Sequence, residues 1–232
     1  MGNAVSGPAV RVQAGALDSY VSELGPDIHY DKSIGHSRFL KTVKANHRNG
    51  PLLIKIFVKP DPGLTVLRTY YKRLTTQRDN LADIPNVYSY QTFAETDKAG
   101  YIIRQWLANS LFDRISTRPF LSLIEKKWIA FQILTGLRDA RRKKVAHGSL
   151  STLNVLITSS NWVYITDFAS HLKPTNLPLH DPDDFYYFFD SGAPERFYDS
   201  GGEIEKLKQT LTTDLWTKDG AITEAMDVFS AG

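Results

Sequence analysis

The chain has 232 residues, with 28 lysines and arginines against 25 aspartates and glutamates, so its formal charge is only +3. This near balance argues against a strongly basic nucleic-acid-binding arm, and we expect no nucleic acid among its partners. A hydrophobic share of 42% supplies a packed core, so the chain is globular rather than intrinsically disordered. Its length fits one two-lobed domain or two small domains.

Several site types are excluded by residue usage. The chain has no cysteine, which removes disulfides, cysteine zinc ligands and a cysteine nucleophile. Its 6 histidines form neither a His-Glu-x-x-His motif nor any i, i+4 pair, so a histidine zinc site is not expected. No apolar run approaches the roughly 18 residues of a membrane span, and no signal peptide is recognisable.

The first residues carry a pattern for lipid attachment. Gly2 and Ser6 stand where N-myristoylation needs a glycine and a hydroxyl residue after removal of Met1. We therefore predict myristate on Gly2. Because one myristoyl chain holds a membrane only marginally, a second contact with the membrane would be needed.

Three segments are expected along the chain. Residues 1–26 form a leader that we expect to be extended from residue 7 on, because Gly, Pro, Ala and Ser dominate it and large apolar residues are few. Residues 27–106 form an N-terminal lobe and residues 107–232 a partial C-terminal lobe. Ordered structure is expected to begin near Tyr30.

The N-terminal lobe contains two predicted strands and a helix. Residues 52–58 are apolar except for Lys55 and are bounded by turn residues, which is typical of a buried strand. Lys55 either has a function there or runs its stem along apolar surface with its charge in solvent. Residues 66–81 have helical apolar spacing, and residues 101–106 indicate another strand.

The C-terminal lobe opens with the clearest helix. Ser122 and Glu125 form a capping box. One face of the helix is apolar, lined by Ile124, Trp128, Phe131, Leu134 and Leu137. The basic end, residues 138–144, is either a solvated helix end that complements the helix dipole or an anion site. Two short strands follow over residues 154–158 and 162–166.

The order and spacing of further signals are those of a protein kinase. The phosphate-loop position keeps only Gly35 of three glycines and includes Ile34 and Ser37. Lys55 follows at the distance of the lysine that binds the nucleotide phosphates. The helix over 66–81 has no carboxylate until Asp79, so the usual ion pair with that lysine is not expected.

The catalytic loop begins at His147. It places Ser149 at the position of the catalytic aspartate, with Asn154 five residues later as a metal ligand. A serine hydroxyl is a poor proton acceptor near neutral pH, and general bases contribute about 10²- to 10⁴-fold. We therefore expect phosphotransfer to be impaired or absent.

The second metal ligand follows in a turn of the Asp-Phe-Gly type. Asp167 opens this turn, and Phe168 and Ala169 complete it. Glu195 ends an Ala-Pro-Glu element, whose role is structural. These parts together predict an α+β, protein-kinase-like fold with a small β-rich N-lobe and a helical C-lobe that the chain covers only to the start of its central helix.

Residues 111–120, 162–170 and 182–190 resemble one kinase family in particular. They are similar to the kinase-like regulatory subunit of the class III phosphatidylinositol 3-kinase complex, the vacuolar protein sorting Ser/Thr kinase family, and most like its fungal members. The likeness covers nearly the whole chain. The family has Asp, Lys and Glu where this chain has Ser149, Ser151 and Leu153, and a basic stretch with cysteines where only residues 191–192 remain.

The resemblance implies ATP or GTP with Mg²⁺ as ligands and the class III lipid kinase catalytic subunit, with its autophagy and sorting adaptors, as partners. It implies a cytoplasmic protein held by a lipid anchor on endosomal, vacuolar, lysosomal or autophagosomal membranes. Three hypotheses follow: a pseudokinase scaffold, a weakly active Ser/Thr kinase, or an incomplete fragment that does not function. The last predicts exposed apolar surface at the final helix.

Overall fold

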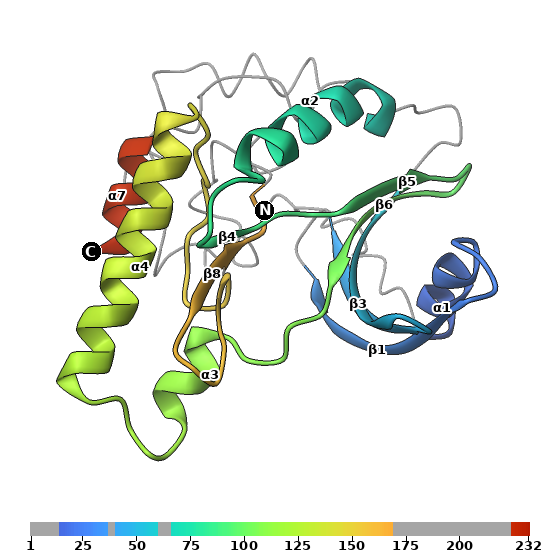
Figure 1. The fold of residues 1–232 in the computed structure, drawn as a ribbon. Coiled ribbons are helices and arrows are strands. Elements are labelled where there is room, and N and C mark those ends of the chain that lie inside the picture. The colour runs from blue at the N-terminus through green and yellow to red at the C-terminus, as the bar shows by residue number, and fades with distance from the viewer. Residues whose placement is uncertain (1–13, 37–39, 60–65, 169–223) are drawn as a thin grey trace, which may run out of the picture. The chain divides into compact units, whose positions relative to one another are not determined.

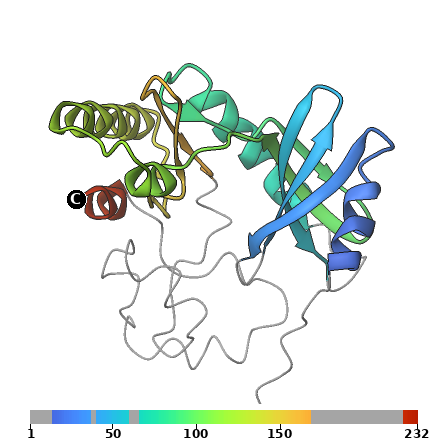
Figure 2. The ribbon, with the colours of Figure 1, turned by 90° about the horizontal axis from the view of Figure 1, so that it is seen from below.

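The computed structural model describes residues 14–36, 40–59, 66–168 and 224–232. The chain divides into two compact units, the first formed by residues 1–64 and 94–106 and the second by residues 65–93 and 107–232. Figures 1 and 2 show the elements of each unit. Four predicted site residues lie outside the described residues, namely Gly2, Ser37, Ala169 and Glu195.

The first unit is built on a five-stranded sheet with the order β1-β2-β3-β6-β5. The strands are β1 (Ile28–His36), β2 (Lys41–His47), β3 (Gly50–Val58), β5 (Thr92–Glu95) and β6 (Ala99–Gln105). The pairs β1–β2, β2–β3 and β3–β6 are antiparallel. The β-branched residues Val43, Ile54 and Ile56 are completely buried, so their packing, together with their preference for extended backbone, explains the strands.

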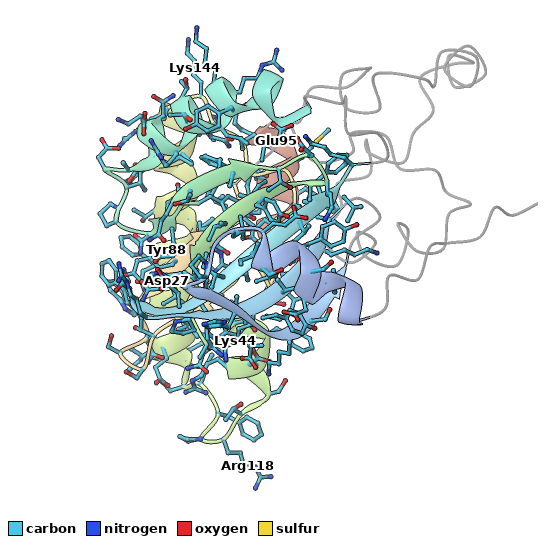
Figure 3. All side chains as sticks on the ribbon, turned by 90° about the vertical axis from the view of Figure 1, so that its right-hand side faces the viewer. Asp27, Lys44, Tyr88, Glu95, Arg118 and Lys144 are labelled. Carbon is cyan, nitrogen blue, oxygen red and sulfur yellow. The ribbon has the colours of Figure 1, made fainter. Side chains whose placement is uncertain are left out.

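A helix stands where the sequence suggested an extended leader, so that part of the prediction was wrong. Helix α1 (Ala14–Ser22) packs beside β1 in Figures 1 and 3. Leu17 and Val21 are buried in the core of the sheet, and Tyr20 and Leu24 pack against it. These four residues follow helical spacing, which the surrounding Gly, Ala and Ser had concealed.

The second unit combines helices with a three-stranded sheet of order β4-β8-β7. The helices are α2 (Val66–Leu81), α3 (Leu111–Ser116), α4 (Leu123–Arg142) and α7 (Glu224–Ala231), and the strands are β4 (Val87–Tyr88), β7 (Val155–Ile157) and β8 (Val163–Thr166). Helix α2, which we expected in the N-terminal lobe, belongs to this unit. The predicted α+β, protein-kinase-like fold is confirmed.

Helix α4 begins with the predicted capping box. The Ser122 hydroxyl accepts the Glu125 backbone N–H, and the Ser122 N–H donates back to the Glu125 carboxylate at 2.8 Å. That backbone donor, followed by the Ser122 hydroxyl, lowers the pKa of Glu125. At the other end, Asp139 binds Arg138 and Arg142, which agrees with a solvated helix end rather than an anion site.

The predicted apolar face of α4 is largely exposed. The exposed fractions are 80% for Ile124, 44% for Trp128, 58% for Phe131 and 58% for Leu134, while Leu137 packs against the core. The buried face instead contains Ile129, Gln132, Gly136 and Ala140. Periodicity does not distinguish two faces that both carry apolar residues. The small side chains decide the contact, because they allow the close approach of β8 and its neighbours.

Candidate active-site loop and metal ligands

His147 lies fully buried at the start of the catalytic loop, residues 147–154. Its Nε2 is 2.6 Å from the Thr166 carbonyl oxygen, and its Nδ1 accepts the Ser149 backbone N–H at 3.1 Å. Because a carbonyl only accepts, Nε2 carries the proton and Nδ1 does not, so the ring is the neutral Nε2–H tautomer. The ring also meets the Phe168 ring edge-on, with 4.7 Å between centroids. His147 therefore joins the loop to both neighbours of Asp167.

The loop is clamped from the far end of the chain by Asp227 on α7. The buried Asp227 carboxylate accepts the His147 backbone N–H at 2.6 Å and the Gly148 N–H at 2.7 Å. Gly148 has φ 74°, in the left-handed region that glycine adopts without strain. Hydrogen bonds to a carboxylate are stronger than those between neutral groups, so this clamp fixes the backbone where the loop begins.

The role of Asp227 was missed from the sequence. Residues 227–232 were placed at the start of the central helix, but an acidic residue in a first helical turn is common simply because it complements the helix dipole. Only the buried carboxylate and its two backbone donors distinguish it.

Ser149 is buried and is positioned through its backbone. Its N–H binds the His147 ring, and its carbonyl oxygen accepts the Asn154 side-chain amide at 2.7 Å. The loop thus has an ordered geometry around a position whose side chain is a neutral hydroxyl. The side chain at this position is not a carboxylate base, although the backbone around it is held by hydrogen bonds.

Asn154 directly precedes β7 and Asp167 directly follows β8, and these two strands are paired. The Asn154 carbonyl oxygen accepts the Thr166 N–H at 2.8 Å, so Asn154 stands across from the residue before Asp167. Because the Asn154 NH₂ group donates to Ser149, its amide oxygen is the atom left to meet a cation. Carboxylate and amide oxygens are the ligands that Mg²⁺ prefers. The donor set would fit a hard cation, and we call these two residues the candidate metal pair.

Asp167 has an unusual backbone and a side-chain partner. Its φ is 67°, a left-handed conformation that aspartate tolerates better than most residues. Its Oδ1 accepts the hydroxyl of buried Tyr90 at 3.0 Å. The sequence did not single out Tyr90, because a tyrosine after a short strand is ordinary core material. A polar contact between positions 77 residues apart leaves no local signal.

The predicted nucleotide-binding residues of the first unit lie on β1 and β3. Lys55 is half-buried in the middle of β3, paired with Thr42 on one side and Ile102 on the other. Ile34 is 42% exposed at an irregularity in the β1–β2 ladder, and Gly35 pairs with Thr42 beyond it. A Cβ on Gly35 would meet no atom within 4 Å, so the local packing of the strand does not require this glycine.

Helix α2 has no described carboxylate that could act as the usual lysine partner before Asp79. The Asp79 carboxylate is bound by its neighbour Arg78 at 2.9 Å.

The described residues contain neither a larger cluster of metal-ligating side chains nor a membrane-spanning helix. No group of three or more His, Cys, Asp or Glu side chains there could hold a metal ion. Likewise, none of the helices in the described ranges has the length and apolarity to cross a bilayer.

Comparison with known proteins shows one consistent likeness, although no family model matches the chain. The chain is 41% identical over 217 residues to the serine/threonine-protein kinase VPS15 of Saccharomyces cerevisiae, which covers 94% of this chain and 15% of that protein. It is 38% identical over 243 residues to VPS15 of Arabidopsis thaliana, covering all of this chain and 15% of the relative. A probable vps15 kinase of Dictyostelium discoideum is 42% identical over 242 residues, again along the whole chain, and 11% of that protein is covered.

The chain thus spans about 11–15% of the length of these curated relatives. The alignments include the catalytic loop and the candidate metal pair, since they extend along at least 94% of the chain. In sequence the chain is thus similar, along nearly its whole length, to part of the VPS15 serine/threonine-protein kinases, and its fold is kinase-like.

Proposed function

We propose that this chain is a pseudokinase, a protein-kinase fold that acts by binding rather than by phosphotransfer. The observation that carries the proposal is Ser149. The loop around it is held by His147, Asp227 and Asn154, yet the position of the proton acceptor has no carboxylate. A general base contributes about 10²- to 10⁴-fold to such a step, so a kinase without one is slow.

Nucleotide binding is retained in this proposal. Lys55 would contact the phosphates of ATP or GTP, with Ile34, Gly35 and Ser37 near them, while Asn154 and Asp167 would hold Mg²⁺. Mg²⁺, when bound, would neutralise negative charge on the nucleotide phosphates. The two oxygen ligands support this assignment.

The proposed role is that of a regulatory scaffold for the class III phosphatidylinositol 3-kinase complex in endosomal and vacuolar sorting and in autophagy. Two observations support this role: the similarity to VPS15 kinases, and Ser149 at the position of the catalytic aspartate. Myristate on Gly2 would hold it at the cytoplasmic face of endosomal, vacuolar, lysosomal or autophagosomal membranes, together with the second contact that a single acyl chain requires.

A second candidate function is weak Ser/Thr protein kinase activity. The relatives are named as serine/threonine-protein kinases, and the side-chain oxygens of Asn154 and Asp167 would suit Mg²⁺. In this reading another group or water accepts the proton of the substrate hydroxyl. Substitution of Ser149 would then change the rate little.

The experiment combines two readouts on the 232-residue chain. The first is formation of phosphatidylinositol 3-phosphate on vesicles by purified class III catalytic subunit, with the chain, without it, and with heat-unfolded chain. The second is transfer of labelled phosphate from ATP to a generic Ser/Thr peptide. The proposal predicts a changed lipid-kinase rate without peptide labelling. Peptide labelling abolished by Lys55→Met would support the weak kinase, and no effect in either assay would contradict both.

A further inference from the structure

We propose that Tyr90 is a positioning residue that orients the Asp167 carboxylate for Mg²⁺. The inference rests on the proposed nucleotide binding and extends it to a residue outside the kinase motifs. Tyr90 would act through Asp167, without touching nucleotide or metal itself.

The topology of the second unit brings the two residues together. Strands β4 and β8 are parallel, with Val87 paired to Ile165 and Tyr88 to Thr166. Both strands end at this register, so the chain segments that follow leave the sheet at the same edge. Tyr90 comes two residues after one strand, and Asp167 follows the other directly. The pairing of β4 with β8 therefore determines that Tyr90 and Asp167 lie close together.

The contact itself is a buried hydrogen bond. The Tyr90 side chain donates to Asp167 Oδ1 at 3.0 Å, and the exposed fractions of the two residues are 3% and 6%. A phenol donor on a carboxylate is a charge-assisted hydrogen bond. A carboxylate has about four acceptor positions, so one hydrogen bond is compatible with metal binding by the same group.

The backbone around Asp167 gives this side-chain contact its importance. The preceding Thr166 is held by Asn154, and the following Phe168 packs on His147. Asp167 itself has φ 67°, away from the ordinary strand conformation. Its backbone is thus fixed by its neighbours. The hydrogen bond from Tyr90 to Oδ1 then restricts the direction in which the carboxylate points.

Partners of this kind are known to matter for metal binding. Groups that hydrogen-bond a ligating side chain orient it, and their loss typically lowers metal affinity by about 10- to 100-fold. Tyr90→Phe removes the hydroxyl and keeps the ring, so the core volume is preserved. We expect this variant to lower the affinity for ATP in the presence of Mg²⁺ by about 10-fold or more.

The test is calorimetric titration of ATP into the full chain, once with Mg²⁺ and once with EDTA. In the unchanged protein, Mg²⁺ should strengthen ATP binding. Tyr90→Phe should lose most of that strengthening and leave the metal-free ATP affinity unchanged. Tyr164→Phe is the matched control, because it removes a hydroxyl from β8, three residues before Asp167, in a ring that packs edge-on to Tyr88. It should retain the full Mg²⁺ effect.

The outcomes separate this inference from the proposed function. If the unchanged protein shows no Mg²⁺-dependent ATP binding, the proposed nucleotide binding and the role of Tyr90 are both contradicted. If it does, and Tyr90→Phe retains the same Mg²⁺ effect, only the role of Tyr90 is overturned. An equal loss of ATP affinity with and without Mg²⁺ would mean a merely structural role and would also overturn it. Tyr90→His, which keeps a ring N–H donor, should preserve more of the Mg²⁺ effect than Tyr90→Phe. The reverse order would contradict the inference even if one variant were less stable.

Discussion

The carboxylate of Asp227 lies 2.6 Å from the backbone nitrogen of His147, although the two residues are 80 positions apart. Through this contact the final helix of the chain supports the loop that carries Ser149. The loop is therefore held in an ordered shape, but it has Ser149 where a carboxylate would accept the proton of the substrate hydroxyl.

Asp227→Asn should weaken this support. One of the two carboxylate oxygens becomes an NH₂ group facing a backbone N–H, so one buried donor loses its acceptor. Leaving a buried donor unsatisfied costs about 1–3 kcal/mol, and we expect the free energy of unfolding to fall by that amount in a denaturant titration. Glu224→Gln, on the same helix, is the control. An unchanged stability of Asp227→Asn would contradict the clamp.

Two glycine-to-alanine changes should have opposite effects. On α4, a Cβ at Gly136 would lie 3.0 Å from Ile165 Cδ1 and 3.2 Å from Asn86 Cβ. Asn86 cannot move easily, because two hydrogen bonds hold it. Its side-chain NH₂ donates to the Val163 carbonyl oxygen at 3.0 Å, and its backbone carbonyl oxygen accepts the Ile165 N–H. Overpacking costs about 1–3 kcal/mol, against a gain in helix propensity of about 1 kcal/mol.

Gly136→Ala should therefore destabilise the second unit by about 1 kcal/mol. Gly35→Ala, which meets nothing within 4 Å, should leave stability equal or slightly higher. Thermal melts of both variants check this pair. A stabilised Gly136→Ala, or a clearly destabilised Gly35→Ala, would show that the packing described for these two positions is not the packing in solution.

Tyr101 should make the stability of the first unit depend on alkaline pH. Burial raises the pKa of Tyr101 from 10.0 to about 12, and its hydroxyl donates to the Tyr20 carbonyl at 2.9 Å. Because the folded state holds the proton more tightly, this stabilisation is complete below pH 10. It is lost as the pH rises from 10 to about 12.

The measurement is the free energy of unfolding between pH 9 and pH 12, where about 1–2 kcal/mol should be lost through this group. Tyr101→Phe is the comparison and should show a smaller slope. Lys98 also contributes in this range, because its hydrogen bond to Glu23 raises its pKa, and it remains in the variant. Identical slopes would mean that Tyr101 does not titrate as described.

Local patterns predicted much of this protein and failed where two distant segments meet. The strand around Lys55 and the capping box of Ser122 depend on neighbouring residues, and both are present in the structure. Helix α1 was missed because small residues dominate its composition, although Leu17 and Val21 supply its buried face.

The candidate site divides in the same way. Motif spacing alone identified Ser149, Asn154 and Asp167 as candidates. The groups that hold them, Asp227 and Tyr90, make contacts across about 80 positions of sequence. Such contacts exist only once the sheet and the helices have formed, so periodicity and spacing do not report them.

Ser149 lies in an ordered loop that has no carboxylate base at this position. Single-turnover phosphate transfer from ATP and Mg²⁺ to a Ser/Thr peptide tests whether this change removes activity, by comparing the unchanged chain with Ser149→Asp and with Ser149→Asn, which lacks the charge. We predict negligible transfer by the unchanged chain and by Ser149→Asn, and a rate at least about 10²-fold higher for Ser149→Asp. Substantial transfer by the unchanged chain that Ser149→Asp does not raise would contradict the proposed pseudokinase.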